Sequence, residues 1–276
     1  MSDTNLVNQM KSLSHELRLM GINRGIAKAA EIATANQLHP LEYLKIILED
    51  EKTFRRERTA KALKTRAKFR SDAELEDWDH GFERGMTRAK FKECASLQFY
   101  QNKESLLLIG STGAGKTHLA IALGKKLCSE GISVHFYSVN FLFEEAQAEK
   151  LAGRYLHFIR RLKQVAVLTL DDFGLRNYTH EEANILLDVL EERYLKGSTL
   201  LTSQVEPQGW GKLFEDPVIA DAIIDRLTKP AKKVIWKGPS YRDQARLSNF
   251  PQSVPPDFLQ CVPVDFPECV PPNFLG

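Results

Sequence analysis

The chain has 276 residues, of which 43% are hydrophobic and 27% charged, and its 38 Lys and Arg nearly balance 36 Asp and Glu. Such a composition is ordinary for a globular protein with one medium and one smaller domain. Without an apolar run of about 18 residues or an apolar leader, we expect no transmembrane helix, no secretory signal and a cytoplasmic location. Four scattered cysteines (Cys94, Cys128, Cys261 and Cys269) lack CxxC spacing, so we expect reduced thiols without zinc or disulfides.

The first part of the chain, about residues 1–70, predicts a small all-α domain. Leucines at helical spacing are followed by an Ala-rich stretch, and Met20–Ile22 suggests a break between two helices. Pro40 suits the first turn of a further helix, because proline is tolerated where no N–H is needed. We therefore expect helices and no strands in this part.

Charge is distributed unevenly at the end of this helical part. Between Lys52 and Arg70 there are nine basic residues and a single acid, Glu57, and five acids follow between Asp72 and Asp79. A basic run can be merely a solvated helix face, but one with so few acidic partners favours a surface that binds phosphates. The candidate DNA-binding residues are Arg55, Arg56, Arg58, Lys61, Lys64, Arg66 and Lys68.

The next parts are a connector, residues 71–104, and a segment of alternating pattern, residues 105–248. Aromatic residues in the connector (Trp78, Phe82 and Phe91) are expected to pack onto the following domain. We expect buried parallel strands at Leu106–Ile109, Val134–Ser138, Val165–Leu170 and Thr199–Ser203. Because stretches long enough for crossover helices separate them, the pattern predicts an α/β fold, a doubly wound parallel sheet with helices on both faces.

The strongest motif follows the first of these strands. Residues Gly110–Thr117, GSTGAGKT, match the phosphate-loop pattern, and a helix is predicted directly afterwards over His118–Cys128. Glycines let backbone N–H groups point at an anion, and the helix N-terminus favours negative charge. We expect Lys116 to contact phosphates and Thr117 to bind Mg²⁺. The candidate nucleotide-binding residues here are Gly110, Ser111, Thr112, Gly113, Ala114, Gly115, Lys116, Thr117 and His118.

A second motif is the apolar strand that delivers Asp171 and Asp172. Strand ends of such sheets face the ligand crevice, so we expect Asp171 to bind Mg²⁺ and Asp172 to orient or deprotonate the attacking water. Two acids in an ordinary loop is the weaker interpretation, because the strand places them beside the phosphate site. Both motifs together predict nucleotide binding but do not separate a kinase, a GTPase and an ATPase.

Two later segments add to this site. The strand that ends at Thr202, Ser203 and Gln204 would place a polar group beside the γ-phosphate if it lies between the phosphate-loop strand and the acid strand. No guanine-binding Asn-Lys-x-Asp motif follows. Farther along, Arg226 is either an arginine that serves the nucleotide of a neighbouring subunit or a surface arginine paired with a nearby acid, Asp221 or Asp225.

These motifs resemble the IstB family, AAA+ ATPases encoded beside the transposase of certain bacterial insertion sequences and similar to DnaC-type helicase loaders. The resemblance covers about residues 1–248 and rests on Leu107–Ala120, Leu170–Gly174, Leu200–Gln204 and Asp225–Leu227. It implies a first sensor at Thr202 or a neighbour, an arginine finger at Arg226 and a second sensor whose Arg242 contacts phosphate. Asp172 stands where many AAA+ proteins have glutamate, and this shorter carboxylate implies slow turnover.

By this resemblance the chain is an ATPase that uses ATP and Mg²⁺, forms a ring or spiral on double-stranded DNA with little sequence preference, and stimulates a cognate transposase. Two alternatives stay open. A DnaC-type helicase loader would bind a helicase and prefer single-stranded DNA, and a small-molecule kinase would leave the basic N-terminal arm without a role. The Pro/Phe-rich tail, residues 249–276, departs from the family pattern; we expect it to be disordered, either inert or with phenylalanines as docking anchors.

Overall fold

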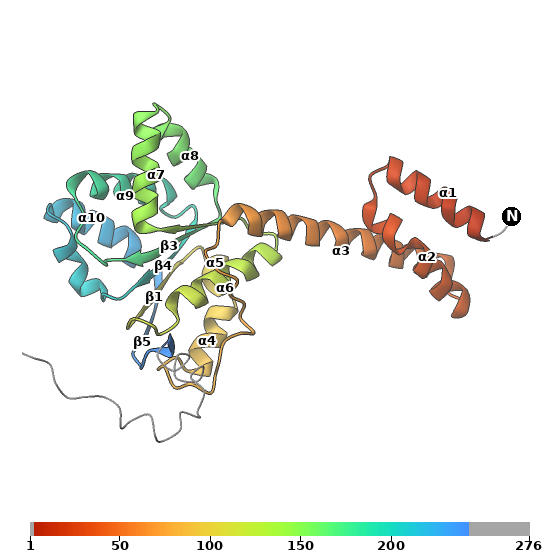
Figure 1. The fold of residues 1–276 in the computed structure, drawn as a ribbon, viewed down its shortest axis with the longest axis horizontal. Helices are drawn as coiled ribbons and strands as arrows, with labels where there is room; N and C mark the ends of the chain where they lie inside the picture. The colour runs from red at the N-terminus through yellow and green to blue at the C-terminus, as the bar shows by residue number, and fades with distance from the viewer. Residues whose placement is uncertain (1–2, 243–276) are drawn as a thin grey trace, which may run out of the picture.

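A computed structural model describes residues 3–242 and shows a three-helix unit joined to an α/β domain (Figure 1). Helix α1 (Asp3–Glu16) packs on α2 (Met20–Ala35), and α2 packs on the first half of α3 (Pro40–Ala67), which continues as one long helix to the α/β domain. The predicted helical N-terminal part is therefore present. The Pro/Phe-rich tail lies outside the described residues.

The expected break between two helices is present but lies at residues 17–19 and not at Met20–Ile22, because α2 begins at Met20 and runs through Gly21. At this point α2 crosses α3 so closely that a Cβ on Gly21 would lie 2.5 Å from the Glu51 Cα. The Glu51 carboxylate accepts hydrogen bonds from the N–H groups of Gly21 at 2.7 Å and Ile22 at 3.2 Å. The preceding Leu19 has no side-chain acceptor, so a carboxylate from α3 caps the start of α2.

The α/β domain contains a five-stranded sheet in the order β2-β3-β4-β1-β5, and all its pairs are parallel. The strands are β1 (Ser105–Gly110), β2 (Val134–Ser138), β3 (Val167–Phe173), β4 (Ser198–Ser203) and β5 (Ala231–Trp236). The four predicted strands are present, and β4 lies between β1 and β3 as expected. The edge strand β5 was missed because its lysines, Lys232 and Lys233, interrupt the apolar run that the buried strands have.

Helices cover both faces of the sheet, as predicted. They are α4 (Arg88–Ala95), α5 (Gln98–Gln101), α6 (Lys116–Ser129), α7 (Val139–Leu151), α8 (Tyr155–Gln164), α9 (His180–Arg193), the 3-10 helix Pro207–Leu213 and α10 (Pro217–Thr228). Alternate residues of β1 enter two cores: Leu107 packs with α7 to α10, whereas Leu106 packs with α6 and the connector. Trp78 and Phe91 of the connector are buried in that second core, which confirms their expected packing onto the α/β domain. Phe82 is half-buried.

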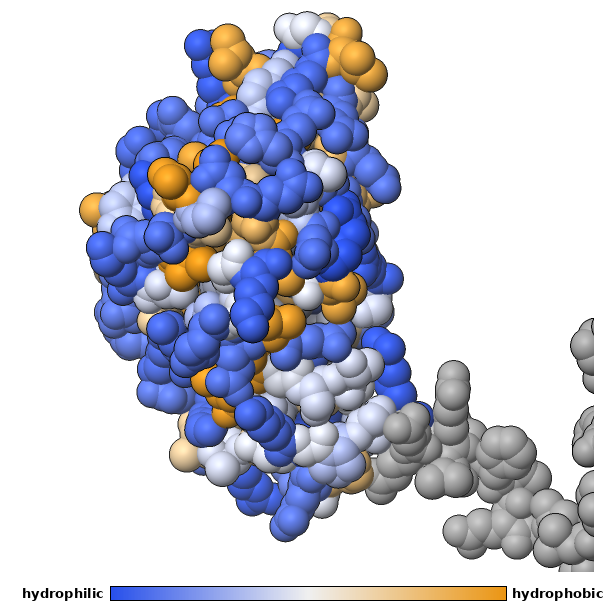
Figure 2. All heavy atoms as spheres, turned by 90° about the vertical axis from the view of Figure 1, so that its left-hand side faces the viewer, coloured by the Kyte–Doolittle hydropathy of each residue, from blue (hydrophilic) through white to orange (hydrophobic). Residues whose placement is uncertain are grey.

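The surface of the α/β domain is largely polar on the side that α9 and α10 cover. Figure 2 shows this face as mostly hydrophilic, with apolar side chains scattered over it. Among the residues that the structure describes, no helix is both long and apolar enough to cross a membrane. Cys94 and Cys128 lie in the second core, and burial raises the pKa of both thiols to about 11.

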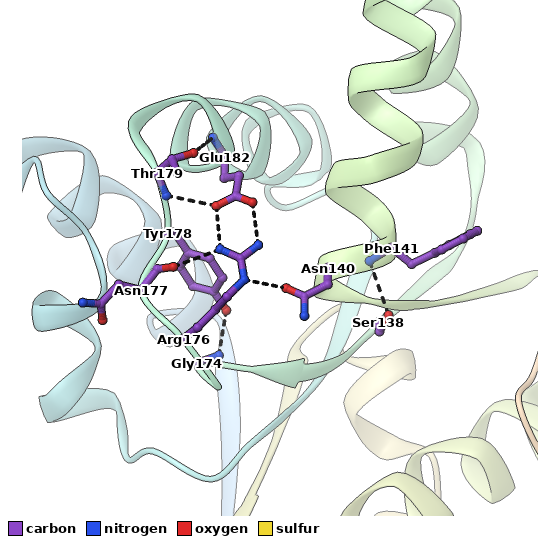
Figure 3. A network of polar contacts seen from close by, with 9 residues as sticks. All are labelled: Ser138, Asn140, Phe141, Gly174, Arg176, Asn177, Tyr178, Thr179 and Glu182. Atoms are coloured by element: carbon purple, nitrogen blue, oxygen red, sulfur yellow. Dashed lines mark hydrogen bonds and ion pairs between the residues drawn. The ribbon is translucent and has the colours of Figure 1, made fainter. Parts of the chain in front are cut away.

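A polar network fixes the loop that follows β3 (Figure 3). Arg176 donates two hydrogen bonds to the Glu182 carboxylate, at 2.9 and 2.6 Å, and a third to the Asn140 amide oxygen at 3.2 Å. Glu182 also accepts from the Thr179 N–H at 3.0 Å and completes a capping box at the start of α9. One arginine thus ties the loop to the first turns of α7 and α9.

We expect Gly21→Ala to destabilise the three-helix unit by about 1–3 kcal/mol, because the new methyl group meets backbone atoms of α3 that cannot move aside. Gly25→Ala is the matched control on the same helix, since its methyl group meets only the Asp50 side chain, which can rotate away. Helical content during urea titration measures both variants. Equal stability of the two variants would contradict the proposed reason for glycine at position 21.

A second prediction concerns acid sensitivity. Hydrogen bonds from Arg176 hold the pKa of Glu182 below its ordinary value of 4.5. A lowered folded-state pKa means that the ion pair stabilises the fold above the ordinary pKa and that this contribution disappears as pH falls through the folded-state value. Glu182→Gln should therefore lower the free energy of unfolding by about 1–3 kcal/mol at pH 7, and the difference should vanish in acid.

Glu181→Gln is the control for this measurement, because Glu181 is exposed and pairs only with Lys150 at 3.2 Å among the ion pairs of residues 3–242. Denaturant titrations from pH 3 to pH 7 compare the two variants with the parent. If the loss of unfolding free energy in Glu182→Gln is the same at every pH in this range, the charge of the Glu182 carboxylate does not contribute to stability.

Candidate nucleotide-binding site

The loop between β1 and α6 forms a cradle of backbone N–H groups. Gly113 and Gly115 have φ values of 75° and 92°, the left-handed region that glycine adopts without strain. A Cβ on Gly110 would lie 2.5 Å from the Trp236 carbonyl oxygen, so the chain leaves β1 through a residue without a side chain. Helix α6 begins at Lys116 with no side-chain cap. Its first N–H groups thus suit an anion such as phosphate.

Lys116 lies inside this loop. Its side chain is buried, and its ammonium donates a hydrogen bond to the Ser111 carbonyl oxygen at 2.9 Å. Burial lowers the pKa of Lys116, and the charge of Arg242 lowers it further, whereas Asp172 and Asp171 raise it. The ammonium is therefore held among groups of both signs at the mouth of the cradle, where an anionic ligand would favour its charged form.

The Asp171 carboxylate joins three elements of the site. One of its oxygens, Oδ1, accepts hydrogen bonds from the Thr117 hydroxyl of α6 at 2.9 Å and from the Thr202 hydroxyl of β4 at 2.6 Å. Thr202 Oγ1 in turn accepts from the Asp172 N–H at 3.0 Å. Burial raises the pKa of Asp171, and the hydrogen bond from Thr202 opposes this shift. The structure thus brings together four residues that the sequence had proposed from three separate segments.

The two acids lie within β3 and not beyond its end, so the predicted strand boundary at Leu170 is wrong. The pairing of β3 with β4 shifts register between Leu170 and Phe173, and Asp172 has a φ of 63°. Aspartate tolerates this left-handed conformation better than most residues. Successive side chains of a regular strand point to opposite faces, but the bulge lets Asp172 approach the same cation as Asp171.

That cation is Arg70, which the sequence did not single out. Its Nη1 lies 3.6 Å from Asp171 Oδ2 and 3.5 Å from Asp172 Oδ2. Arg70 and Asp172 are 102 positions apart in the chain, and the motif that defines the acids contains no information about so distant a partner. The sequence indicated only that the basic segment from Lys52 to Arg70 binds anions, and not which anions Arg70 contacts.

The donor set fits ATP and Mg²⁺. Asp171 Oδ2 is buried and makes no hydrogen bond to any described residue, so this oxygen is available to coordinate a cation beside the Thr117 hydroxyl. Carboxylate and hydroxyl oxygens are ligands that Mg²⁺ prefers. The glycine cradle and the start of α6 supply the matching place for phosphates. Thr117 and Asp171 are thus the candidate magnesium ligands.

The phosphate loop is also held by the segment that follows β5. Ser111 donates a hydrogen bond from its hydroxyl to the Gly238 carbonyl oxygen at 2.8 Å. The Tyr241 N–H donates to the Gly113 carbonyl oxygen at 3.0 Å. Because Arg242 follows Tyr241 directly, this backbone hydrogen bond brings the residue expected to act as second sensor close to the loop.

Two further loop residues contact the neighbouring strands. Thr112 donates a hydrogen bond from its hydroxyl to the Gln204 side chain, just beyond β4, at 2.6 Å. Ala114 is buried, and its carbonyl oxygen accepts a hydrogen bond from the Trp236 indole of β5 at 3.2 Å. The loop is therefore fixed against both strands that flank β1.

His118, in the first turn of α6, contacts the connector and not the loop. Its imidazole lies 3.3 Å from the Glu74 carbonyl oxygen, and the centre of the ring is 6.0 Å from that of Trp78. The side chain of His118 therefore anchors the connector to α6 in this structure.

Arg226 is not brought to the phosphate loop of its own chain. It lines a small pocket with Ser105 at the amino end of β1, whereas the loop follows the carboxyl end of this six-residue strand, about 17 Å away. Its guanidinium pairs with Glu191 of α9 and not with the nearby Asp221 or Asp225. In its own subunit Arg226 therefore has a structural partner and no access to the nucleotide site.

The candidate DNA-binding residues lie along the second half of α3 and its cap. All are exposed except Lys64, which is half-buried and lies 3.8 Å from Glu74. Arg55 pairs with Glu51 at 2.7 Å and so also supports the carboxylate that caps α2. These cations lie on more than one side of α3, because Arg55, Arg58 and Arg66 line one surface pocket and Arg56, Lys61 and Lys64 line another. None of them pairs with the two acids of β3.

Comparison with known proteins identifies the family. A model of the IstB-like ATP binding protein family matches residues 12–249. An insertion-sequence ATP-binding protein of Sinorhizobium fredii is 36% identical over 235 residues, which cover 84% of this chain and 96% of the relative. The IS21 ATP-binding protein of Pseudomonas aeruginosa is 32% identical over 236 residues, 86% of this chain and 89% of the relative.

Among solved structures, a replication initiator DnaA bound to AMPPCP and single-stranded DNA aligns with a TM-score of 0.53 at 19% identity, covering 70% of this chain and 59% of that one. This likeness supports the fold alone. The family match, the two relatives and the phosphate-binding geometry lead to one conclusion: the chain belongs to the IstB-like family of ATP-binding proteins.

Proposed function

We propose that this chain hydrolyses ATP with Mg²⁺, assembles on double-stranded DNA in the cytoplasm and assists a transposase. Its relatives are named as ATP-binding proteins of insertion sequences, which supports a role in transposition. The observation on which the proposal rests is the exposed basic half of α3, which is joined directly to the domain that contains the nucleotide site.

The basic half of α3 is suited to a duplex. From Arg55 to Lys68 the chain covers about 20 Å at 1.5 Å per residue, a length that meets several phosphates of B-form DNA. Figure 1 shows much of α3 standing clear of the α/β domain, so a duplex can approach it. Contacts of this kind are with phosphates and not with base edges, so binding should depend little on sequence.

The nucleotide site supplies distinct chemical roles. Lys116 neutralises phosphate charge, and Thr117 and Asp171 would hold Mg²⁺, which would supply further positive charge beside the phosphates. The Asp171 side chain is fully buried, whereas that of Asp172 is 35% exposed and accessible to water. Asp172 therefore orients the attacking water, and Thr202 positions both acids through its hydroxyl. An aspartate in this role reaches less far than glutamate, so turnover is slow.

Arg226 completes the site of a neighbouring subunit in this proposal. Arg226 lies at the amino ends of the strands, so it cannot reach the phosphate loop of its own chain. Its side chain is 23% exposed, so a neighbouring subunit can approach it. The hydrophilic face over α9 and α10 in Figure 2 suits an interface that needs nucleotide to form, because little apolar surface would drive a permanent one. Arg242, by contrast, contacts the phosphates of the nucleotide that is bound by the phosphate loop of its own chain.

The first test measures DNA binding as a function of salt. Replacing four exposed cations of α3 by Ala should lower the slope of log affinity against log salt by about 0.9 for each phosphate that the variant no longer binds. The four are Arg56, Arg58, Lys61 and Arg66. A control variant replaces four exposed cations elsewhere, Arg88, Lys92, Lys196 and Lys212.

Fluorescence anisotropy with duplex DNA gives the slopes, and binding of a fluorescent ATP analogue shows that the nucleotide site is intact. The α3 variant should also lose the stimulation of ATPase activity by DNA. If both variants keep the parental slope, DNA is not bound by α3. An ATPase rate that ignores DNA in the parent protein would instead favour a metabolite kinase.

The second test concerns the shared site. Arg226→Ala subunits should bind ATP without hydrolysing it, and Lys116→Ala subunits should bind it poorly. In a mixture, an intact phosphate loop can meet an intact Arg226, and since arginine fingers contribute about 10³–10⁵ in rate, even few restored interfaces are measurable. Lys229→Ala, which removes an exposed cation on the same helix end, is the control. Parental hydrolysis by Arg226→Ala alone would exclude the finger.

A further inference from the structure

The junction between the basic helix and the α/β domain places a cation at the nucleotide site. Helix α3 ends at Ala67, and Lys68 turns the chain with a φ of 59°. The next residue, Phe69, packs edge-on against Phe136 at 6.1 Å and fills the space left by Gly124, where a Cβ would lie 2.7 Å from the ring. The backbone before Arg70 is thus anchored to the core.

Arg70 is the nearest counter-charge of the two acids. Among residues 3–242 it is the one cation within ion-pair distance of either carboxylate, because Lys116 turns to the Ser111 carbonyl instead. Its partner oxygen on Asp171 is buried and makes no hydrogen bond there. A buried carboxylate without compensation is costly, so Arg70 neutralises the site when no other cation does.

We propose that Arg70 is an internal counter-ion that leaves the two acids when Mg²⁺ and ATP bind, and that its release couples the nucleotide site to the DNA-binding helix. The inference rests on the proposed roles of Asp171 and of α3. A guanidinium and a magnesium ion repel each other, and the buried Asp171 carboxylate cannot serve both at full strength. Binding of one therefore disfavours contact with the other.

The released guanidinium has a second anion within its reach. The Arg70 side chain is 47% exposed and lies two positions after the exposed Lys68, so two neighbouring cations stand at the end of α3. A DNA phosphate bound near Lys68 and Arg70 can replace the carboxylates as the partner of Arg70. DNA and Mg²⁺–ATP then favour the same released state, and by linkage each increases the affinity for the other by the same factor.

The test titrates Mg²⁺ against the full-length protein with a fluorescent ATP analogue, first without DNA. Arg70→Ala removes the competing cation, so the Mg²⁺ concentration at half-saturation should fall roughly two- to fivefold. Lys52→Ala, an exposed cation on the same helix that contacts neither acid, should leave it unchanged. Arg70→Met, which keeps a long unbranched side chain beside Phe136, replaces the Ala variant if that one fails to fold.

The titration is then repeated with saturating duplex DNA. DNA should lower the midpoint in the parent and in Lys52→Ala, and this shift should shrink toward none in the Arg70 variants. A midpoint that rises or stays equal when Arg70 is removed would overturn the proposal, because Arg70 would then assist the phosphates or not compete at all. Failure of the parent to bind DNA would refute the proposed function of α3, whereas the DNA-free midpoints would still decide whether Arg70 competes with Mg²⁺.

Discussion

The buried carboxylate of Asp171 is the constraint around which the α/β domain is organised. A charge with no solvent exposure needs partners from every side, and they come from α6, from β4 and from the segment after α3. Since each partner belongs to a different element, one side chain fixes the start of α6 against the ends of two strands. The glycine loop is held separately, by hydrogen bonds to Gln204, Trp236 and Gly238, and the two sets of contacts meet at the start of α6.

Sequence patterns predicted those elements that are determined by contiguous residues. The apolar run of β1 and the glycines after it are contiguous, and each can be interpreted without its neighbours. Strand β5 has lysines at an edge that solvent reaches, so its pattern lacks the uniform burial that marks the other strands. Gly21 looked like a helix break because glycine is a poor helix former, yet the close approach of α3 makes it the residue that fits.

The parts of the candidate site that are made of contiguous residues could be predicted from the sequence, whereas contacts between residues far apart in the chain were missed. Phosphate loop and acids follow known spacings, but the contact of Arg70 with Asp172 joins positions that no spacing rule relates. Arg176 was missed for a similar reason, although the capping box at Thr179 and Glu182 was visible in the sequence. Arg226 is the reverse case: a resemblance implied its role, whereas the structure shows Arg226 paired with Glu191 of its own chain.

The continuity of α3 has a mechanical consequence. Its 28 residues make a rod about 42 Å long with no break between the sheet and the two small helices at its far end. A rod held at one end behaves as a lever, and a tilt of about 10° at the junction would displace the opposite tip by about 7 Å, two base-pair steps along a duplex. A small adjustment beside the carboxylates would thus become a movement of several ångströms at the far end of α3.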